Sequence, residues 1–161
     1  MKNEHLTPRN SPFSPGDAAP DFTLLDQNRA EWKLSSAAAK GPVVLCFYPM
    51  SFTSVCSTEM KCVDSEMASW QSKGLQVVGI SCDSFAVQKA WADAENFKHP
   101  LLADMHRSVC RAYGLYWPDL NVASRGTVVV EQGAGGGLVV KWSQSREVKR
   151  AMDWSEILAA V

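Results

Sequence analysis

The feature that most restricts the fold is a run of six consecutive apolar residues, 43–48, which ends at Pro49. A strand with one solvated face alternates apolar and polar residues, whereas an uninterrupted apolar run of this length indicates a strand buried on both faces. After the proline, apolar residues recur at helical spacing as far as Gly74, which predicts a helix that ends there. A buried strand therefore leads directly into a helix.

The remaining patterns extend this unit into an α/β chain. Further strands are expected at residues 21–25, 75–81, 100–103, 126–130 and 138–142, and further helices at 84–94, 108–113 and 154–161. This order predicts an α/β fold with a mixed central β-sheet flanked by helices, in a single domain over residues 16–161. Residues 1–15 hold three prolines and show no periodicity, so we expect a mobile N-terminal tail.

Charge and composition exclude several classes of partner. Sixteen Lys and Arg against seventeen Asp and Glu give a formal net charge of −1, which offers no basic footprint for nucleic acid or anionic lipid. No apolar stretch approaches the ~20 residues of a membrane-spanning helix, and the first residues lack a secretory signal. We therefore expect a cytoplasmic protein. Five cysteines, an odd number, favour free and reactive thiols over a disulfide framework.

Cys56 lies where the predicted helix begins. If Thr53 is the N-cap, Cys56 is within the first turn, where unpaired N–H groups and the helix dipole favour an anion. Keeping a thiol mostly ionised at neutral pH takes roughly 2.7 kcal/mol, whereas a helix terminus supplies at most about 2 kcal/mol. A cation must contribute as well. Arg125 is the candidate, because it precedes the strand at 126–130 and strand ends of an α/β sheet meet at one edge.

These residues form recognisable motifs. The pattern Pro49-x-x-x-Thr53-x-x-Cys56 resembles the active-site signature of the peroxiredoxins, the AhpC/TSA superfamily, and the segment 125–127 resembles their arginine motif. Further segments resemble the superfamily in order and spacing: residues 16–24, Trp91, 100–104 and 112–114. The resemblance extends from residue 16 to the end of the chain. The closing stretch from Arg146 to Ala160 is most similar to the AhpE-type, one-cysteine branch.

The resemblance implies a thioredoxin-like fold and an antioxidant enzyme that reduces hydrogen peroxide, alkyl hydroperoxides or peroxynitrite. Cys56 would be the peroxidatic nucleophile that becomes a sulfenic acid. The Thr53 hydroxyl, the Cys56 backbone N–H and Arg125 would donate hydrogen bonds to the departing oxygen. Pro49 would shield the pocket, and Glu59 would orient Arg125 through a charge-assisted pair. The resemblance further implies no cofactor and a homodimer or larger homo-oligomer.

A second, resolving thiol is not identified by the sequence. On a continuous helix, Cys62 would lie about 9 Å along the axis from Cys56, beyond the ~7 Å limit between the Cα atoms of a disulfide. Cys46 lies inside the apolar strand and is expected to be buried and inert. Cys82 and Cys110, like Cys62, remain candidates. We expect a one-cysteine cycle in which an external thiol or a redoxin reduces the sulfenic acid.

Other features predict less. The three histidines, His5, His99 and His106, are scattered and predict no metal site. The charged segment 146–150 is expected to be a solvated loop. An alternative function is a redox-sensing or interaction protein of thioredoxin fold in which Cys56 is oxidised but turns over slowly. Repeated recycling by a reductant separates the enzyme from the sensor.

Overall fold

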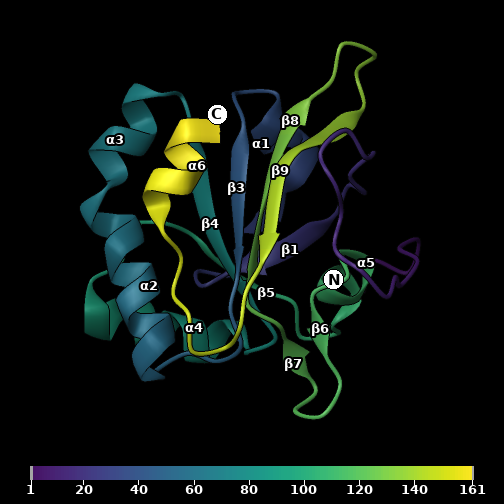
Figure 1. The fold of residues 1–161 in the computed structure, drawn as a ribbon. Helices are drawn as coiled ribbons and strands as arrows, with labels where there is room; N and C mark the ends of the chain where they lie inside the picture. Colours follow the sequence, from purple (N-terminus) through teal and green to yellow (C-terminus); the bar gives the residue numbers. More distant parts are fainter. Residues whose placement is uncertain (1, 161) are drawn as a thin grey trace.

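The computed structural model describes residues 2–160, which form a mixed sheet covered by helices on both faces (Figure 1). The seven-stranded sheet has the order β2-β1-β5-β4-β3-β8-β9. Its strands are β1 (Thr23–Asp26), β2 (Glu31–Lys33), β3 (Val43–Phe47), β4 (Gln76–Ser81), β5 (Leu101–Ala103), β8 (Gly126–Gln132) and β9 (Leu138–Ser145). A separate hairpin joins β6 (Tyr116–Trp117) to β7 (Val122–Ala123). The helices are α1 (Leu34–Ala38), α2 (Ser54–Ser65), α3 (Met67–Ser72), α4 (Phe85–Glu95), α5 (Ser108–Ala112) and α6 (Trp154–Ala160).

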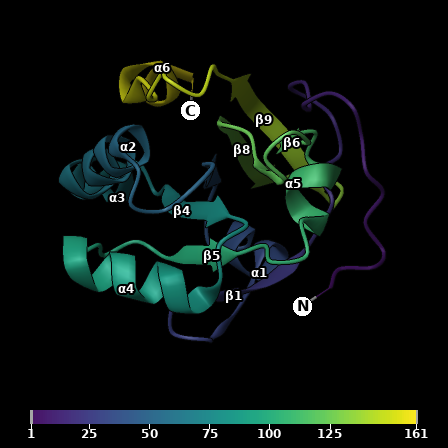
Figure 2. The same ribbon diagram turned by 90° about the horizontal axis from the view of Figure 1, so that it is seen from below.

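Strand β3 is the centre of the sheet. It pairs in parallel with β4 and antiparallel with β8, and all five of its residues are buried. Val43, Leu45 and Phe47 pack into a core with α1 and α5, whereas Val44 and Cys46 pack into a second core under α2, α3, α4 and α6. Figure 2 shows these two layers from below, with β4 and β5 between them. Both faces of β3 are therefore covered, which confirms the α/β fold expected from its uninterrupted apolar run.

Several local elements differ from the predicted ones. The helix expected to continue to Gly74 is divided at Glu66, where ψ of 9° departs from helical geometry, into α2 and α3. Gly74, with φ of +70°, follows the end of α3 as expected. The short elements β2, α1, β6 and β7 were not predicted, because two to five residues are too few to show a period. Val161, the predicted end of the last helix, lies outside the described residues.

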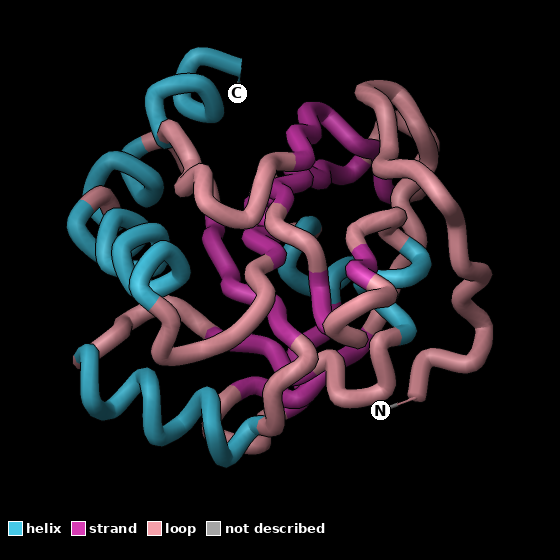
Figure 3. Tube along the Cα trace, turned by 60° about the horizontal axis from the view of Figure 1, so that its bottom comes forward, coloured by secondary structure: helices cyan, strands magenta, loops and turns pink. Residues whose placement is uncertain are grey.

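The N-terminal segment packs against the domain rather than extending from it. Figure 3 shows it as a long loop that follows the surface of the domain. The Asn3 side chain exchanges two hydrogen bonds with the Thr23 backbone, at 2.9 and 3.0 Å. Phe13 is only 9% exposed, and its ring lies 5.3 Å from that of Tyr113. The structure therefore places this segment against the domain, because an irregular chain can bury one aromatic ring without any periodic pattern.

No helix within residues 2–160 is long and apolar enough to cross a membrane.

Candidate active site

Cys56 lies at the start of α2, immediately beyond the buried end of β3. Thr53 is the N-cap in an extended conformation, and its carbonyl accepts a hydrogen bond from the Ser57 N–H at 2.8 Å. Cys56 is consequently the third helical residue, as the spacing predicts, and is only 1% exposed. Its backbone N–H is therefore one of the first-turn groups that lack partners within the helix.

The loop before α2 is held at both ends. The Thr53 hydroxyl donates to the Met50 carbonyl at 2.9 Å and does not cap a helix N–H. The Ser51 N–H donates to Asp83 Oδ2 at 2.8 Å, which ties the loop to the end of β4. Between them, Phe52 adopts φ of +62°, an unusual conformation for a side chain of this size. The Thr53 hydroxyl oxygen keeps its lone pairs available for a donor such as a hydroperoxide.

Arg125 provides the cation that the sequence analysis required. Gly126 pairs with Phe47, so Arg125 lies at the end of β3 where α2 begins. Its guanidinium is 1% exposed, and Nη2 donates to Cys56 Sγ at 3.1 Å. Nε donates to the Val148 carbonyl at 2.9 Å, which fixes the plane of the guanidinium. This contact places a buried positive charge and an N–H donor against the sulfur.

Glu59 lies one helical turn after Cys56 and holds the arginine in place. It is 1% exposed, and its Oε2 accepts a hydrogen bond from Arg125 Nη1. Its other oxygen, Oε1, accepts from Arg146 Nη2 at 2.8 Å and from the Met152 N–H at 3.2 Å. Glu59 therefore contacts both buried arginines and one backbone N–H.

The charge of this cluster is balanced by a thiolate. Arg125, Arg146 and Glu59 together carry a net charge of +1 and are almost completely removed from water. An uncompensated buried charge is costly. When Cys56 loses its proton, the four side chains become neutral as a set. A negative charge on the sulfur would therefore balance the charge of the cluster.

Arg146 is the site residue that the sequence analysis missed. The segment 146–150 was expected to be a solvated loop, yet the Arg146 side chain is 2% exposed. Besides Glu59, it donates to the Thr127 hydroxyl at 3.1 Å. Burial lowers the pKa of Arg146, and the neighbouring Glu59 opposes that change. Arg150 does remain largely solvated, with a side chain 67% exposed, so only part of the segment behaves as a charged run predicts.

Pro49 and the remaining cysteines occupy distinct positions. Pro49 is buried between β3 and the Cys56 loop. Cys62 shares the unbroken helix α2 with Cys56, so a disulfide between them would require the helix to unwind. Cys46 is 1% exposed, and burial, reinforced by Glu59, raises the pKa of its thiol.

Cys82 and Cys110 belong to the other core. They pack with α1 and α5, on the opposite side of the sheet from Cys56. Within residues 2–160, theirs are the only two sulfurs within hydrogen-bonding distance of each other, at 3.7 Å. The structure therefore brings none of the candidate resolving cysteines into contact with Cys56.

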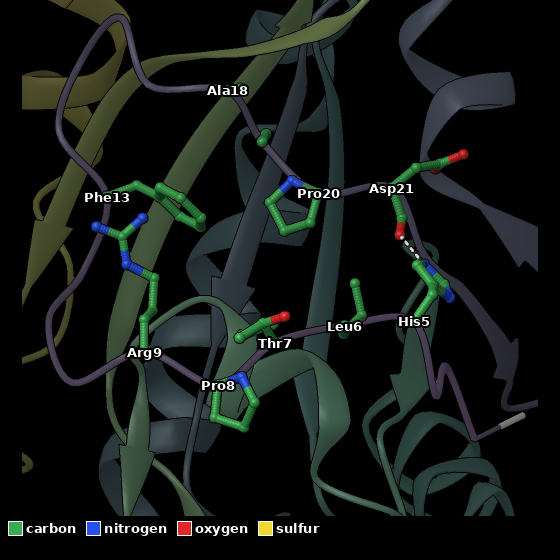
Figure 4. A pocket seen from close by; sticks show the side chains of 11 residues that line it. His5, Leu6, Thr7, Pro8, Arg9, Phe13, Ala18, Pro20 and Asp21 are labelled. Atoms are coloured by element: carbon green, nitrogen blue, oxygen red, sulfur yellow. Dashed lines mark hydrogen bonds between the residues drawn. The ribbon is translucent and has the colours of Figure 1, made fainter.

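A pocket on another part of the surface is unrelated to this chemistry. Figure 4 shows it between the N-terminal segment, including His5 and Phe13, and the residues before β1. The His5 ring contacts the Asp21 carbonyl at 2.9 Å across it. None of its lining residues belongs to the cluster around Cys56. The reactive sulfur instead lies in a tightly packed site.

The chain is similar in sequence to known proteins over most of its length. Residues 15–134 match the AhpC/TSA family. The chain is 32% identical to alkyl hydroperoxide reductase E of Mycobacterium tuberculosis, over 91% of this chain and 96% of that protein. It is also 32% identical to the chloroplastic 2-Cys peroxiredoxin BAS1 of Hordeum vulgare, over 73% of this chain and 60% of the other.

Solved structures of similar chains have the same fold. The reduced 2-Cys peroxiredoxin of Plasmodium vivax superimposes with a TM-score of 0.81 at 27% identity, covering 91% of this chain and 79% of that one. Peroxidoxin BcpB of Mycobacterium tuberculosis superimposes with a TM-score of 0.80 at 28% identity, covering 91% of this chain and 94% of the other.

Proposed function

The chain belongs to the AhpC/TSA family and is a peroxiredoxin, a thiol peroxidase, and we propose that Cys56 is its peroxidatic residue. The substrates would be hydrogen peroxide, alkyl hydroperoxides or peroxynitrite. The observation that carries the assignment is the hydrogen bond from Arg125 Nη2 to Cys56 Sγ, 3.1 Å, inside a cluster whose charge balances only when the sulfur is ionised.

The first half of the cycle follows from this arrangement. The Cys56 thiolate attacks one oxygen of the hydroperoxide, a sulfur–oxygen bond forms, and the oxygen–oxygen bond breaks. The sulfur is oxidised to a sulfenic acid, and the departing alkoxide or hydroxide takes a proton from solvent to leave as an alcohol or as water. Negative charge moves from the sulfur to the departing oxygen during this step. Donors already fixed around the sulfur stabilise that charge without reorganising.

Each neighbouring group has a part in this step. The Arg125 guanidinium donates to the sulfur, and the Cys56 N–H is a first-turn donor that would serve the departing oxygen. The Thr53 hydroxyl, whose proton goes to the Met50 carbonyl, would accept a hydrogen bond from the hydroperoxide. Glu59 positions Arg125 by accepting its Nη1 hydrogen bond. Pro49, buried at the end of β3, limits the access of water to the sulfur. Water exclusion strengthens each of these electrostatic contacts.

The second half of the cycle uses a reductant from outside the chain. Two thiols, or one dithiol redoxin, convert the sulfenic acid to the thiol, and they leave as a disulfide with one molecule of water. The unbroken helix that separates Cys62 from Cys56 supports this one-cysteine cycle, as does the location of Cys82 and Cys110 in the opposite core.

The assembly of the chain is proposed from the family resemblance, and its location from the sequence alone. We expect a cytoplasmic protein that forms a homodimer or a larger homo-oligomer. Sedimentation of the reduced chain as a monomer at micromolar concentration would contradict the assembly.

The cycle is tested by mass spectrometry of the reduced chain after one equivalent of hydrogen peroxide. We expect one added oxygen, located at Cys56 by a sulfenic-acid trap, and no intramolecular disulfide. The Cys62→Ala variant should give the same result, whereas Cys56→Ser should take up no oxygen. A disulfide that joins Cys56 to Cys62, Cys82 or Cys110 would replace the one-cysteine cycle. Oxidation at Cys56 without repeated turnover by any thiol or redoxin would instead favour the sensor.

A further inference from the structure

Three ionisable side chains meet near the ends of β4 and β5, in the core opposite Cys56. They are Cys82, Asp104 and Cys110, and the two sulfurs and one carboxylate oxygen all lie within 4.8 Å of one another. Cys82 follows β4, Asp104 follows β5, and Cys110 lies in α5, to which β5 leads through a loop (Figure 2). The Asp104 N–H donates to the Ser81 carbonyl at 2.8 Å. The pairing of β4 with β5 therefore fixes the position of two of the three groups.

Asp104 is the group that most needs an additional partner. It is 1% exposed, and its Oδ2 accepts the Cys110 N–H at 2.8 Å. Its other oxygen, Oδ1, is buried and has no hydrogen-bond partner among the described residues. Within residues 2–160 no Lys, Arg or His side chain forms an ion pair with it. The nearby Arg107 guanidinium instead donates to two backbone carbonyls.

Two of the three groups are costly to ionise without a cation. Burial raises the pKa of the Asp104 carboxyl. The contact with Cys82, together with burial, raises the pKa of the Cys110 thiol. The Cys110 N–H at Oδ2 offsets only part of the cost of burying this carboxylate, because Oδ1 has no partner among the described residues. A bound divalent cation would offset this cost and would deprotonate the thiols.

The geometry fits one class of cation. Two thiolate sulfurs that each bind a tetrahedral zinc at about 2.3 Å lie about 3.8 Å apart, and the sulfurs of Cys82 and Cys110 are 3.7 Å apart. Zinc accepts thiolate and carboxylate ligands in the same site, whereas magnesium and calcium require oxygen alone. A disulfide would use both sulfurs but would leave Asp104 Oδ1 without a partner. We propose that Cys82, Cys110 and Asp104 bind Zn²⁺, with the fourth position taken by water.

The role of this zinc would be structural. It would join the ends of β4 and β5 to α5 from within the core opposite Cys56, so the proposal does not depend on the peroxidase function. The expectation of no metal considered only the scattered histidines. The ligands found here come from three separate elements, and only the fold brings them together.

The test uses the full chain, which is reduced and stripped of metal under anaerobic conditions. Co²⁺ serves as the spectroscopic probe and Zn²⁺ as its competitor. We expect about one cobalt ion per chain, with the near-ultraviolet charge-transfer band of thiolate ligands, and its displacement by zinc. Cys82→Ser and Cys110→Ser should each weaken zinc binding by at least about 100-fold. Asp104→Asn should keep the thiolate band and bind more weakly. The matched controls Cys62→Ser and Cys56→Ser should bind as the native chain does.

X-ray absorption of the zinc-loaded native chain keeps the proposal testable if a variant fails to fold. Two sulfur ligands completed by oxygen would support it, and a coordination sphere without sulfur would overturn it. Zinc binding that survives in both Cys82→Ser and Cys110→Ser, or that is lost in Cys56→Ser, would also overturn it. The proposal would also be overturned if the reduced chain failed to take up zinc and peroxide treatment produced a Cys82–Cys110 disulfide. That result would give the two cysteines a redox role.

Discussion

Replacing Arg125 with methionine removes the positive charge beside Cys56 while keeping a side chain of similar length. At 3.1 Å, a unit charge and a thiolate attract each other by about 5 kcal/mol at an effective dielectric constant of about 20. Arg146 remains on the other side of Glu59 and recovers part of this attraction. The loss of one charge-assisted hydrogen bond, about 1.5–3 kcal/mol, is the lower bound. Peroxide oxidation should therefore slow by roughly 10²–10³-fold at neutral pH, as when an oxyanion donor is removed.

The assay is stopped-flow oxidation of the reduced chain across a range of pH. Raising the pH should not restore the full rate in Arg125→Met, because the donor to the departing oxygen is still absent. Arg150→Met is the matched control, since this arginine is 67% exposed and makes only a distant surface ion pair at 3.8 Å. A neutral-pH rate for Arg125→Met within a few-fold of the control would refute the reasoning.

Three further changes test other parts of the account. Glu59→Gln leaves two buried arginines without the negative charge beside them and should lower the free energy of unfolding by about 3–5 kcal/mol in urea titrations. An unchanged urea midpoint would show that the ion pairs of Glu59 are not needed for stability. Burial acts to raise the pKa of Asp64, but the hydrogen bond and charge of His99 outweigh it and hold that pKa below its usual range. The stability from Asp64 is thus present above pH ~4 and is lost as the pH falls through the lower pKa of the folded chain. Asp64→Asn should therefore destabilise the chain more at pH 7 than at pH 3. Equal destabilisation at both pH values would contradict this. Cys62→Ala should leave the rate of Cys56 oxidation unchanged in stopped-flow traces, and a loss of rate would give Cys62 a part in the site.

The position of the reactive pair could be predicted because neighbouring strands determine it. The apolar run that ends at Pro49 fixes the end of β3, and the strand that begins after Arg125 pairs with it through Gly126 and Phe47. Antiparallel pairing of these two strands brings Arg125 to the start of the helix that contains Cys56. Sequence order and strand ends identified Arg125, and the antiparallel direction of β8 completes the inference.

The parts that sequence reasoning missed depend on contacts between distant segments. Arg146 looks like one more member of a charged run, and its burial follows from the path of the chain after β9, where its N–H donates to the Arg125 carbonyl at 2.9 Å. The Thr53 hydroxyl was expected to donate to the departing oxygen, but in the structure the Met50 carbonyl accepts its proton. The contact between Cys82 and Cys110 likewise requires the register of β4 with β5 and the placement of α5. None of these contacts leaves a local pattern.

The most direct test of the account is the second-order rate at which the fully reduced native chain is oxidised, measured by stopped flow with hydrogen peroxide and with an organic hydroperoxide, beside Cys56→Ser. The account predicts a rate far above that of a free thiol for at least one of the two peroxides, and its complete loss in Cys56→Ser. A native chain that reacts no faster than a free thiol, or a Cys56→Ser variant that keeps the fast reaction, would contradict the claim that this buried sulfur is the peroxidatic group.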